Sequence, residues 1–338
     1  MQAIVQNRYG PPDRVLELRD VERPHPGEGE VLVRVRASCV HADVWHEVTG
    51  RPWALRLMGA GFKQPIKPIP GTDLAGVVEA VGPKATRFRP GDEVFGETHV
   101  ELVWRNGGAW AEYAAVAEET LARKPATVSF EEAAAVPAAG FIALLNLRGN
   151  ARPRPGMRVL VNGAGGGVGS TVVQLAKARQ AHVTGVDRGD KLEMIASLGA
   201  DRVIDYTQED FTRQERRYDL IVDVASTLSL RACRRVLTSD GVLLVIGHDH
   251  FGQAKGRVLG SIPRMLGLML LSRVVDHLPD SQGEPPPTKR EAMARLAELL
   301  AEGRLRPVLD RVYPLAEARE AMRYLQSGRP RGRIVLEP

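Results

Sequence analysis

Short apolar runs, each closed by turn residues, characterise the first 120 or so positions of the chain. Residues 31–36 (VLVRVR) alternate with a period of two, which is typical of a half-buried strand. Further strands are predicted at 74–81, 93–95 and 113–116, with glycine, proline and aspartate between them. No long helical period precedes residue 130, so we expect a compact β-rich unit here.

The pattern becomes helical over residues 131–147, and the segment RPRPG at 152–156 ends it. Strands then alternate with helices that begin near Ser170, Lys191 and Ser229. Alternation of this kind gives parallel strands joined by right-handed crossovers, so we predict a doubly wound parallel sheet. The predicted strands are 158–161, 182–186, 203–204, 220–223 and 241–246.

The order loosens after Gly247. An apolar run at 262–271 suits a lid or a dimer contact, and suits attachment to a membrane surface less well. Two helices, at 289–301 and 316–326, and a last strand at 333–336 are predicted to follow.

A glycine-rich turn joins the first strand of the alternating region to its first helix. Residues 157–177 read MRVLVNGAGGGVGSTVVQLAK. Such a turn leaves free backbone N–H groups at a helix N-terminus, where the helix dipole also favours an anion. Ala164-x-Gly166-x-x-Gly169 matches the dinucleotide fingerprint, and Asp187 ends the next strand, where a carboxylate can bind an adenosine ribose. The order of these features predicts a dinucleotide site; a tight turn in another α/β protein is the alternative.

Length and composition narrow the class of protein. The 338 residues suit two domains, and 43% of them are hydrophobic, which allows a sizeable core. The net charge of +5 is scattered without a long basic run, so we do not expect nucleic-acid binding. Two cysteines, Cys39 and Cys233, build no disulfide framework. No signal-peptide pattern opens the chain and its most apolar stretch, 262–275, is too short for a membrane span, so we expect a cytoplasmic protein.

Six segments occur in an order that resembles the medium-chain dehydrogenase/reductase family, over nearly the whole chain. Within that family the chain is similar to the zinc-independent quinone oxidoreductase branch. The resemblance implies a GroES-like β-rich catalytic domain (1–125 and 280–338), an inserted Rossmann dinucleotide-binding domain (126–279), an active site in the cleft, and a homodimer. The six segments are PGEGEVLVRV (26–35), GTDLAGVVEAVG (71–82), RPGDE (89–93), the glycine turn, LGADRVID (198–205) and RGRIVL (331–336).

The positions that hold catalytic zinc in other family members lack good ligands here. Gly71-Thr72-Asp73 stands where those members have Gly-His-Glu, and a threonine does not replace an imidazole as a zinc ligand. His41 stands at the position of the first cysteine ligand, and Cys39 lies two residues before it. The position of the third ligand falls among the alanines of 133–139. The resemblance therefore implies no zinc, and a side chain, a ribose or water must supply the proton.

The candidate proton donors are His41, Asp43 and His46, which lie close together in the predicted pocket wall at 38–53. A histidine beside a carboxylate can donate or orient a proton near neutral pH. The alternative is that His46 is a surface residue and His41 satisfies a buried hydrogen bond.

The nicotinamide cofactor is expected to be NADH slightly more than NADPH. Asp187 would repel a 2′-phosphate, whereas Arg188, Lys191 and Tyr206 favour one; the alternative role of Asp187 is to cap the following helix. The predicted cofactor-binding residues are Gly163, Ala164, Gly165, Gly166, Gly167, Val168, Asp187, Arg188, Lys191, Tyr206, Gly247, His248 and Arg333.

The activity that these features predict is zinc-independent hydride transfer from NAD(P)H to a small molecule: a quinone, an enone or a carbonyl. One alternative is alcohol dehydrogenase-like oxidation of a small alcohol. Another is a cofactor-binding sensor or interaction protein without turnover.

Overall fold

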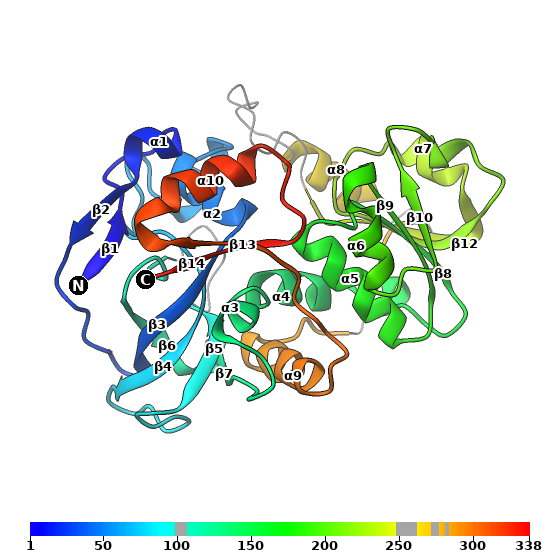
Figure 1. Cartoon of the computed structure of the whole chain (residues 1–338). Coiled ribbons are helices and arrows are strands. Elements are labelled where there is room, and N and C mark those ends of the chain that lie inside the picture. The colour runs from blue at the N-terminus through cyan, green and yellow to red at the C-terminus, as the bar shows by residue number, and fades with distance from the viewer. Residues whose placement is uncertain (99–106, 248–261, 272–276, 281–283) are drawn as a thin grey trace.

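The computed structural model describes residues 1–338 apart from 99–106, 248–261, 272–276 and 281–283. Two large sheets lie side by side, one mixed and one parallel (Figure 1). Both chain termini lie on the side of the mixed sheet, because the end of the chain returns to the unit in which it began (Figure 1). The architecture is a Rossmann-like parallel sheet together with a β-rich unit, as the sequence predicted.

The mixed sheet has seven strands in the order β13-β14-β3-β4-β5-β7, with β6 paired to β3. Its central strand β3 buries Val31, Val33 and Val35 in one core cluster, as the alternating pattern predicted. The last strand, β14, pairs with β3, so that residues from the two ends of the chain lie next to each other. The strands are β3 (Glu30–Val40), β4 (Asp73–Val81), β5 (Glu93–Glu97), β6 (Tyr113–Ala117), β7 (Leu121–Arg123), β13 (Leu309–Pro314) and β14 (Arg333–Glu337), while β1 (Gln2–Val5) and β2 (Glu17–Asp20) form a separate pair.

The five strands of the other sheet are all parallel, in the order β10-β9-β8-β11-β12. Successive residues of β8 face opposite sides: Val159 and Val161 share a core cluster with Val172, whereas Leu160 shares one with Cys233. Helices thus cover both faces of this sheet. The elements are β8 (Arg158–Asn162), α5 (Gly167–Ala178), β9 (His182–Asp187), α6 (Leu192–Ser197), β10 (Arg202–Asp205), β11 (Tyr218–Asp223), α7 (Leu230–Arg234) and β12 (Leu237–Val245).

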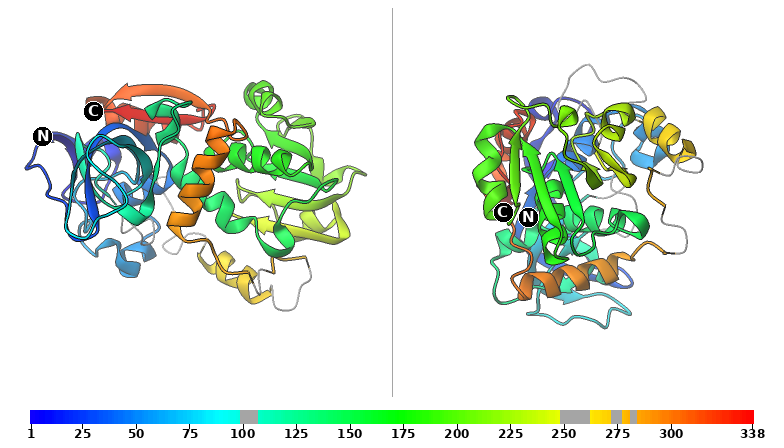
Figure 2. Two further views of the ribbon diagram at one scale, coloured as in Figure 1. Left: turned by 90° about the horizontal axis from the view of Figure 1, so that it is seen from below. Right: turned by 90° about the vertical axis from the view of Figure 1, so that its right-hand side faces the viewer.

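Three helices lie between the two sheets: α3 (Phe130–Ala134), α4 (Pro137–Asn146) and α9 (Lys289–Ala301). Figure 2 shows α9, in orange, between the two units, where it packs against both α4 and β7. The buried ammonium of Lys289 pairs with Glu97 of β5 and ties this helix to the mixed sheet. One apolar core cluster therefore runs from the parallel sheet through these helices to Ala75 and Phe95 of the mixed sheet.

The structure corrects three helix predictions. Helix α5 begins at Gly167, three residues before the predicted start at Ser170, so the last three residues of the predicted turn are helical. The single helix predicted over 131–147 is two helices, because Pro137 lacks the N–H that a helix interior needs and begins a new first turn. In the β-rich part the prediction omitted α2 (Ala42–Thr49), which buries Val44 and Val48 and ends at Gly50 in the left-handed conformation (φ 60°).

The remaining α-helices of the described residues are α1 (Pro12–Val15), α8 (Ile262–Leu271) and α10 (Ala318–Gln326). In the apolar run, α8 leaves Leu266 and Leu270 exposed. None of the helices within the described part of the chain is long and apolar enough to cross a membrane.

Candidate active site

The glycine-rich turn connects β8 to α5 and leaves the N-terminus of that helix open. Gly166 is the N-cap, and no described side chain caps the helix. Gly163 has a left-handed backbone (φ 84°), and a Cβ on Gly169 would lie only 2.0 Å from the Gly163 carbonyl oxygen. The turn thus needs these glycines, and the first turn of α5 offers backbone N–H donors to an anion.

Arg333, the first residue of β14, reaches from the mixed sheet to this helix N-terminus. A Cβ on Gly167 would lie 2.3 Å from Arg333 Nη1, so the guanidinium packs directly on the first residue of α5. The Arg333 side chain is only 10% exposed, and its Nε has no hydrogen-bond partner in the described part of the chain. A buried guanidinium with a free donor beside a helix N-terminus fits the pyrophosphate of a dinucleotide.

Asp187 ends β9 beside the same turn. Its Oδ2 accepts a hydrogen bond from Gly165 N at 2.8 Å, its Oδ1 accepts one from Arg188 N at 2.8 Å, and Lys191 Nζ lies 3.8 Å from Oδ1. Tyr206 is 56% exposed, and its backbone N–H donates to the Asp187 carbonyl. The structure thus brings these predicted adenosine-side residues together.

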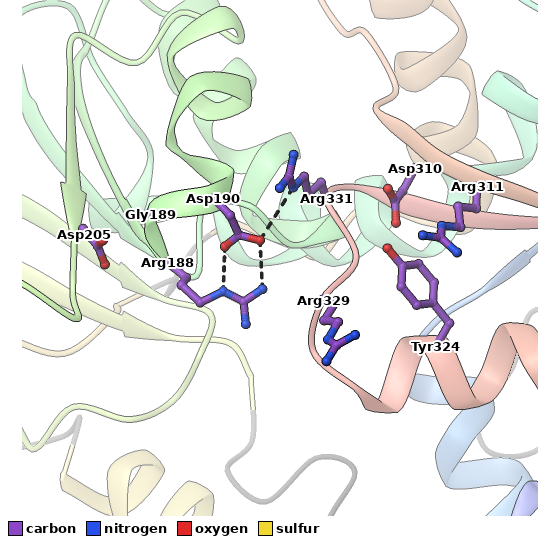
Figure 3. A pocket seen from close by; sticks show the side chains of 9 residues that line it. All are labelled: Arg188, Gly189, Asp190, Asp205, Asp310, Arg311, Tyr324, Arg329 and Arg331. Atoms are coloured by element: carbon purple, nitrogen blue, oxygen red, sulfur yellow. Dashed lines mark hydrogen bonds and ion pairs between the residues drawn. The ribbon is translucent and has the colours of Figure 1, made fainter.

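The other predicted cofactor residues differ in how they are placed. Gly247 allows a close approach after β12, because a Cβ there would lie 1.8 Å from the Val224 carbonyl oxygen. His248 lies outside the described residues. The Arg188 guanidinium turns to Asp190, with bonds of 2.6 and 2.9 Å (Figure 3).

A cavity of about 710 Å³ adjoins Arg188 and lies between the two units. Arg331 of the last segment reaches across to Asp190 at 3.6 Å, so both units share this carboxylate. The cavity is lined by Arg188, Gly189, Asp190, Asp205, Asp310, Arg311, Tyr324, Arg329 and Arg331.

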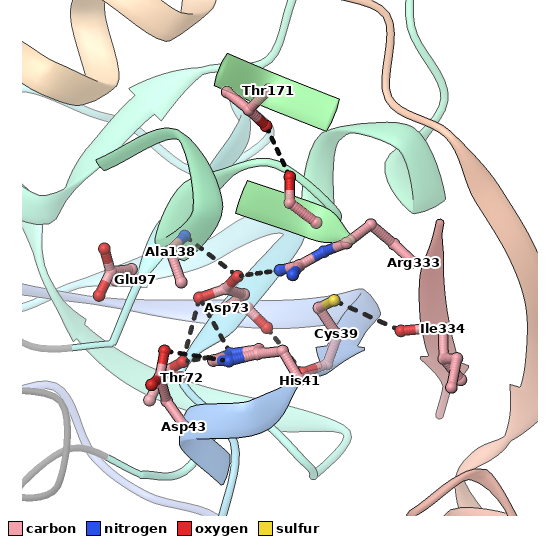
Figure 4. A network of polar contacts seen from close by, with 12 residues as sticks. Cys39, His41, Asp43, Thr72, Asp73, Glu97, Ala138, Thr171, Arg333 and Ile334 are labelled. Carbon is pink, nitrogen blue, oxygen red and sulfur yellow. Dashed lines mark hydrogen bonds and ion pairs between the residues drawn. The ribbon is translucent and has the colours of Figure 1, made fainter. Parts of the chain in front are cut away.

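His41, immediately before α2, is 4% exposed and has an acceptor at each ring nitrogen (Figure 4). Nδ1 lies 3.4 Å from Asp43 Oδ2, and Nε2 lies 3.0 Å from Thr72 Oγ1. The Thr72 hydroxyl donates its own hydrogen to Asp73 Oδ1 at 3.0 Å, so it can only accept from His41. This arrangement favours a hydrogen on each ring nitrogen, which is the imidazolium form.

Electrostatics agree with this protonation state. Burial disfavours the charged ring, but Asp73 and Asp43 outweigh it and raise the pKa of His41 well above 6.5. Burial alone would raise the pKa of Asp73, but His41, Arg333 and the Ala138 N–H together lower it below 3.8. The site thus holds a buried imidazolium–carboxylate pair.

Asp73, at the start of β4, is fully buried and is the centre of this group. Its Oδ2 accepts from Ala138 N at 3.1 Å, at the N-terminus of α4, and lies 3.4 Å from Arg333 Nη2. In the sequence, Asp73 was noted only as part of Gly71-Thr72-Asp73, the segment that stands where other family members have Gly-His-Glu. The signal for its role was a carboxylate at the start of a strand whose next five residues, 74–78, have no polar side chain.

Three residues at or near the positions where the resemblance places zinc ligands contact the Asp73 carboxylate instead: His41, Thr72 and Ala138. The nitrogens of His41 face two different carboxyl groups. Among the described residues, no three His, Cys, Asp or Glu side chains are grouped to hold a metal ion. This donor set does not fit catalytic zinc.

His46 contacts residues of α2 and of the loop that follows it. It is buried rather than on the surface, its Nδ1 contacts the Arg51 carbonyl oxygen, and its ring meets Trp45 edge to face. Next to it, Glu47 accepts from Gly71 N at 3.4 Å, and burial raises its pKa well above 4.5.

Comparisons with known proteins cover nearly the whole chain. Residues 27–126 match the family model "Alcohol dehydrogenase GroES-like domain", and residues 198–336 match "Zinc-binding dehydrogenase". The chain is 31% identical to the chloroplastic quinone-oxidoreductase QR1 of Triphysaria versicolor, with 100% of this chain and 98% of that protein covered. It is 29% identical to the chloroplastic NADPH-dependent alkenal/one oxidoreductase of Arabidopsis thaliana (100% and 80% covered). The quinone oxidoreductase from Coxiella burnetii has the same fold, with a TM-score of 0.80 at 24% identity over 100% of this chain and 99% of that one.

Proposed function

Because the chain belongs to the medium-chain dehydrogenase/reductase family it is an oxidoreductase, and we propose that it transfers hydride from NAD(P)H to a quinone, an enone or a carbonyl without a metal ion. The relatives named as quinone and alkenal/one oxidoreductases support this substrate class. The observation that carries the metal-free proposal is the buried His41–Asp73–Arg333 group, in which His41 stands where the resemblance places the first zinc ligand.

The residues that would hold the cofactor are those around the N-terminus of α5. The glycine turn and Arg333 would bind its pyrophosphate, and Asp187 with Lys191 would bind the adenosine ribose. When bound, the cofactor supplies the hydride.

We propose a slight preference for NADH. Two backbone N–H groups fix the Asp187 carboxylate beside the turn, where it disfavours a 2′-phosphate. The observation that favours NADPH is the adjoining cavity, in which Arg329 and Arg331 add positive charge next to Arg188. The two features oppose each other, so the preference stays small.

We propose that His41 holds the proton that the reduced substrate takes up. The imidazolium is buried, and Asp73 stabilises its charge. The substrate would take the Nδ1 proton and leave a neutral ring, and Asp43, whose side chain is 24% exposed, would return a proton from solvent to Nδ1 after each turnover. His46 is assigned the lesser role of positioning the loop after α2, through its contact with Arg51.

The test combines binding and turnover. We expect NADH and NADPH to bind in a fluorescence titration, and quinones or enones to oxidise the bound cofactor. His41→Asn should lower turnover by much more than it weakens cofactor binding, since general acid catalysis contributes about 10²–10⁴-fold. His182→Asn, at an exposed histidine, is the matched control. Unchanged turnover in His41→Asn would remove this residue from the mechanism.

The same assays separate the alternative functions. An alcohol dehydrogenase-like enzyme would reduce NAD⁺ with small alcohols, and a sensor would bind cofactor without any turnover. We also propose a homodimer, from the resemblance alone, which light scattering of the purified protein tests.

A further inference from the structure

One continuous path of buried contacts joins the expected pyrophosphate site to His41. Arg333 packs on Gly167 at one end and lies 3.4 Å from Asp73 Oδ2 at the other. The opposite oxygen of the same carboxylate, Oδ1, lies 3.7 Å from His41 Nε2 and accepts the Thr72 hydroxyl hydrogen (Figure 4). Asp73 is therefore shared by two cations, of which only Arg333 reaches the cofactor site.

An anion at the N-terminus of α5 would change this balance in one direction. Its charge would offset the positive potential of Arg333, which in the free protein opposes a proton on His41. It would also draw the guanidinium toward itself, so that more of the Asp73 charge acts on His41. Both effects favour the imidazolium, and buried charges of this kind interact strongly because water screens them little.

We propose that cofactor binding and protonation of His41 are coupled through Arg333 and Asp73, so that the pyrophosphate of the bound cofactor stabilises the proton on His41. The inference rests on the proposed function. Arg333 and Asp73 are then positioning residues, since they act on the proton of His41 from outside the reaction. The consequence for catalysis is that the proton donor is fully charged when the hydride donor is in place.

Linkage makes the coupling reciprocal. If the cofactor raises the pKa of His41, then protonated His41 must bind the cofactor more tightly by the same factor. A shift of one pKa unit corresponds to about tenfold in Kd. The cofactor Kd should therefore rise with pH across the interval between the pKa values of His41 in the free and bound proteins.

Several other titratable or charged groups face His41, and their titration must be distinguished from that of His41 in such an experiment. Burial raises the pKa of the Cys39 thiol and of Glu47, and it raises the pKa of Glu97 to about 7 although Lys289 opposes the rise. A direct signal from His41 is therefore needed beside the binding curve. The charged or titratable groups around His41 are Cys39 on β3, Asp43 and Glu47 on α2, Asp73 on β4, Glu97 on β5 and Arg333 on β14.

The experiment is an NMR pH titration of histidine-labelled protein, with the His41 signal assigned from His41→Asn. It is run without ligand, with saturating ADP-ribose, and with adenosine. ADP-ribose has the pyrophosphate but no nicotinamide, so that the ring cannot act on His41 directly. We expect ADP-ribose to raise the pKa of His41 by about one unit, equivalent to about tenfold in affinity, and adenosine to leave it unchanged.

Two variants test the route. In Asp73→Asn, ADP-ribose should no longer raise the pKa of His41. In Arg333→Gln, the rise in pKa should be severalfold smaller, even when enough ADP-ribose is added to saturate the variant. If either variant does not fold, the comparison of ADP-ribose with adenosine in the wild-type protein still tests whether the pyrophosphate raises the pKa of His41.

An unmoved His41 pKa in protein saturated with ADP-ribose overturns the coupling and leaves the proposed function intact. An effect of the same size in Asp73→Asn also overturns the coupling through Asp73. No binding of ADP-ribose, NADH or NADPH overturns both proposals, so the failures are distinguishable.

Discussion

Asp73→Asn tests whether the buried charges around His41 contribute to stability as the structure indicates. The substitution keeps the size of the side chain and an oxygen that can accept from Ala138 N, but it removes the negative charge that His41 and Arg333 share. Removal of one partner from a buried ion pair costs about 3–5 kcal/mol. We expect a loss of that size in the free energy of unfolding at pH 6, where both partners are charged.

The pH dependence of this loss has a defined sign. The pKa of His41 is raised in the folded state, so its contribution to stability is full below its ordinary value of 6.5. That contribution is lost as the pH rises through the raised pKa. The pKa of Asp73 is lowered, so its contribution is present above its ordinary 3.8 and is lost only as the pH falls through the lowered value. The difference between wild type and variant should therefore shrink as the pH is raised above 6.5.

The assay is urea unfolding followed by tryptophan fluorescence, at several pH values. The control is Asp13→Asn, because Asp13 forms an exposed ion pair with Arg323 at 2.9 Å, and exposed pairs contribute about 0–1 kcal/mol. If the two variants lose equal stability, or if the cost of Asp73→Asn does not change with pH, the reasoning about this buried group is refuted.

Three further predictions concern the cofactor and the proton. Gly167→Ala should raise the Kd of NADH and NADPH at least tenfold in fluorescence titrations, because a Cβ there would meet Arg333. The control Gly267→Ala, at a glycine with open space around it, should leave both Kd values unchanged. Equal effects of the two substitutions would contradict the proposed pyrophosphate site. Asp187→Ser should shift the ratio of the two Kd values toward NADPH, and an unaltered ratio would argue against a ribose contact. The kcat/KM for the substrate, measured in steady-state assays with saturating cofactor, should fall as the pH rises through the raised pKa of His41. A kcat/KM that does not change with pH would contradict the role of His41 as the proton donor.

The sequence predicted those parts of the structure that depend on neighbours in the chain. The turn from β8 to α5 and the end of β9 at Asp187 are local, and their glycine and hydrophobic patterns were sufficient. Helix α9 has the predicted bounds, 289–301, and begins at a capping box of Thr288 and Glu291. Helix α2 was omitted although Val44 and Val48 have helical spacing, because β-branched residues in a short segment also suit a strand.

The group around His41 could not be assembled from the sequence. Asp73 and Arg333 are 260 residues apart in the chain, and they meet only because β14 returns to pair with β3. The sequence identified His41 and Arg333 separately, one as a proton donor and the other as a cofactor residue. The carboxylate that joins them follows from the order of strands in the mixed sheet, which no local pattern specifies.

The central claim is that this chain moves a hydride from a nicotinamide cofactor while His41, and no metal ion, supplies the proton. The most direct test is the rate of NADH and NADPH oxidation with a quinone and an enone, measured on protein dialysed against a chelator, with and without added Zn²⁺. Oxidation of either cofactor should depend on the substrate, survive chelation, not increase with zinc and fall by about 10²–10⁴-fold in His41→Asn. Turnover that appears only with zinc, or is unaffected in His41→Asn, would contradict it.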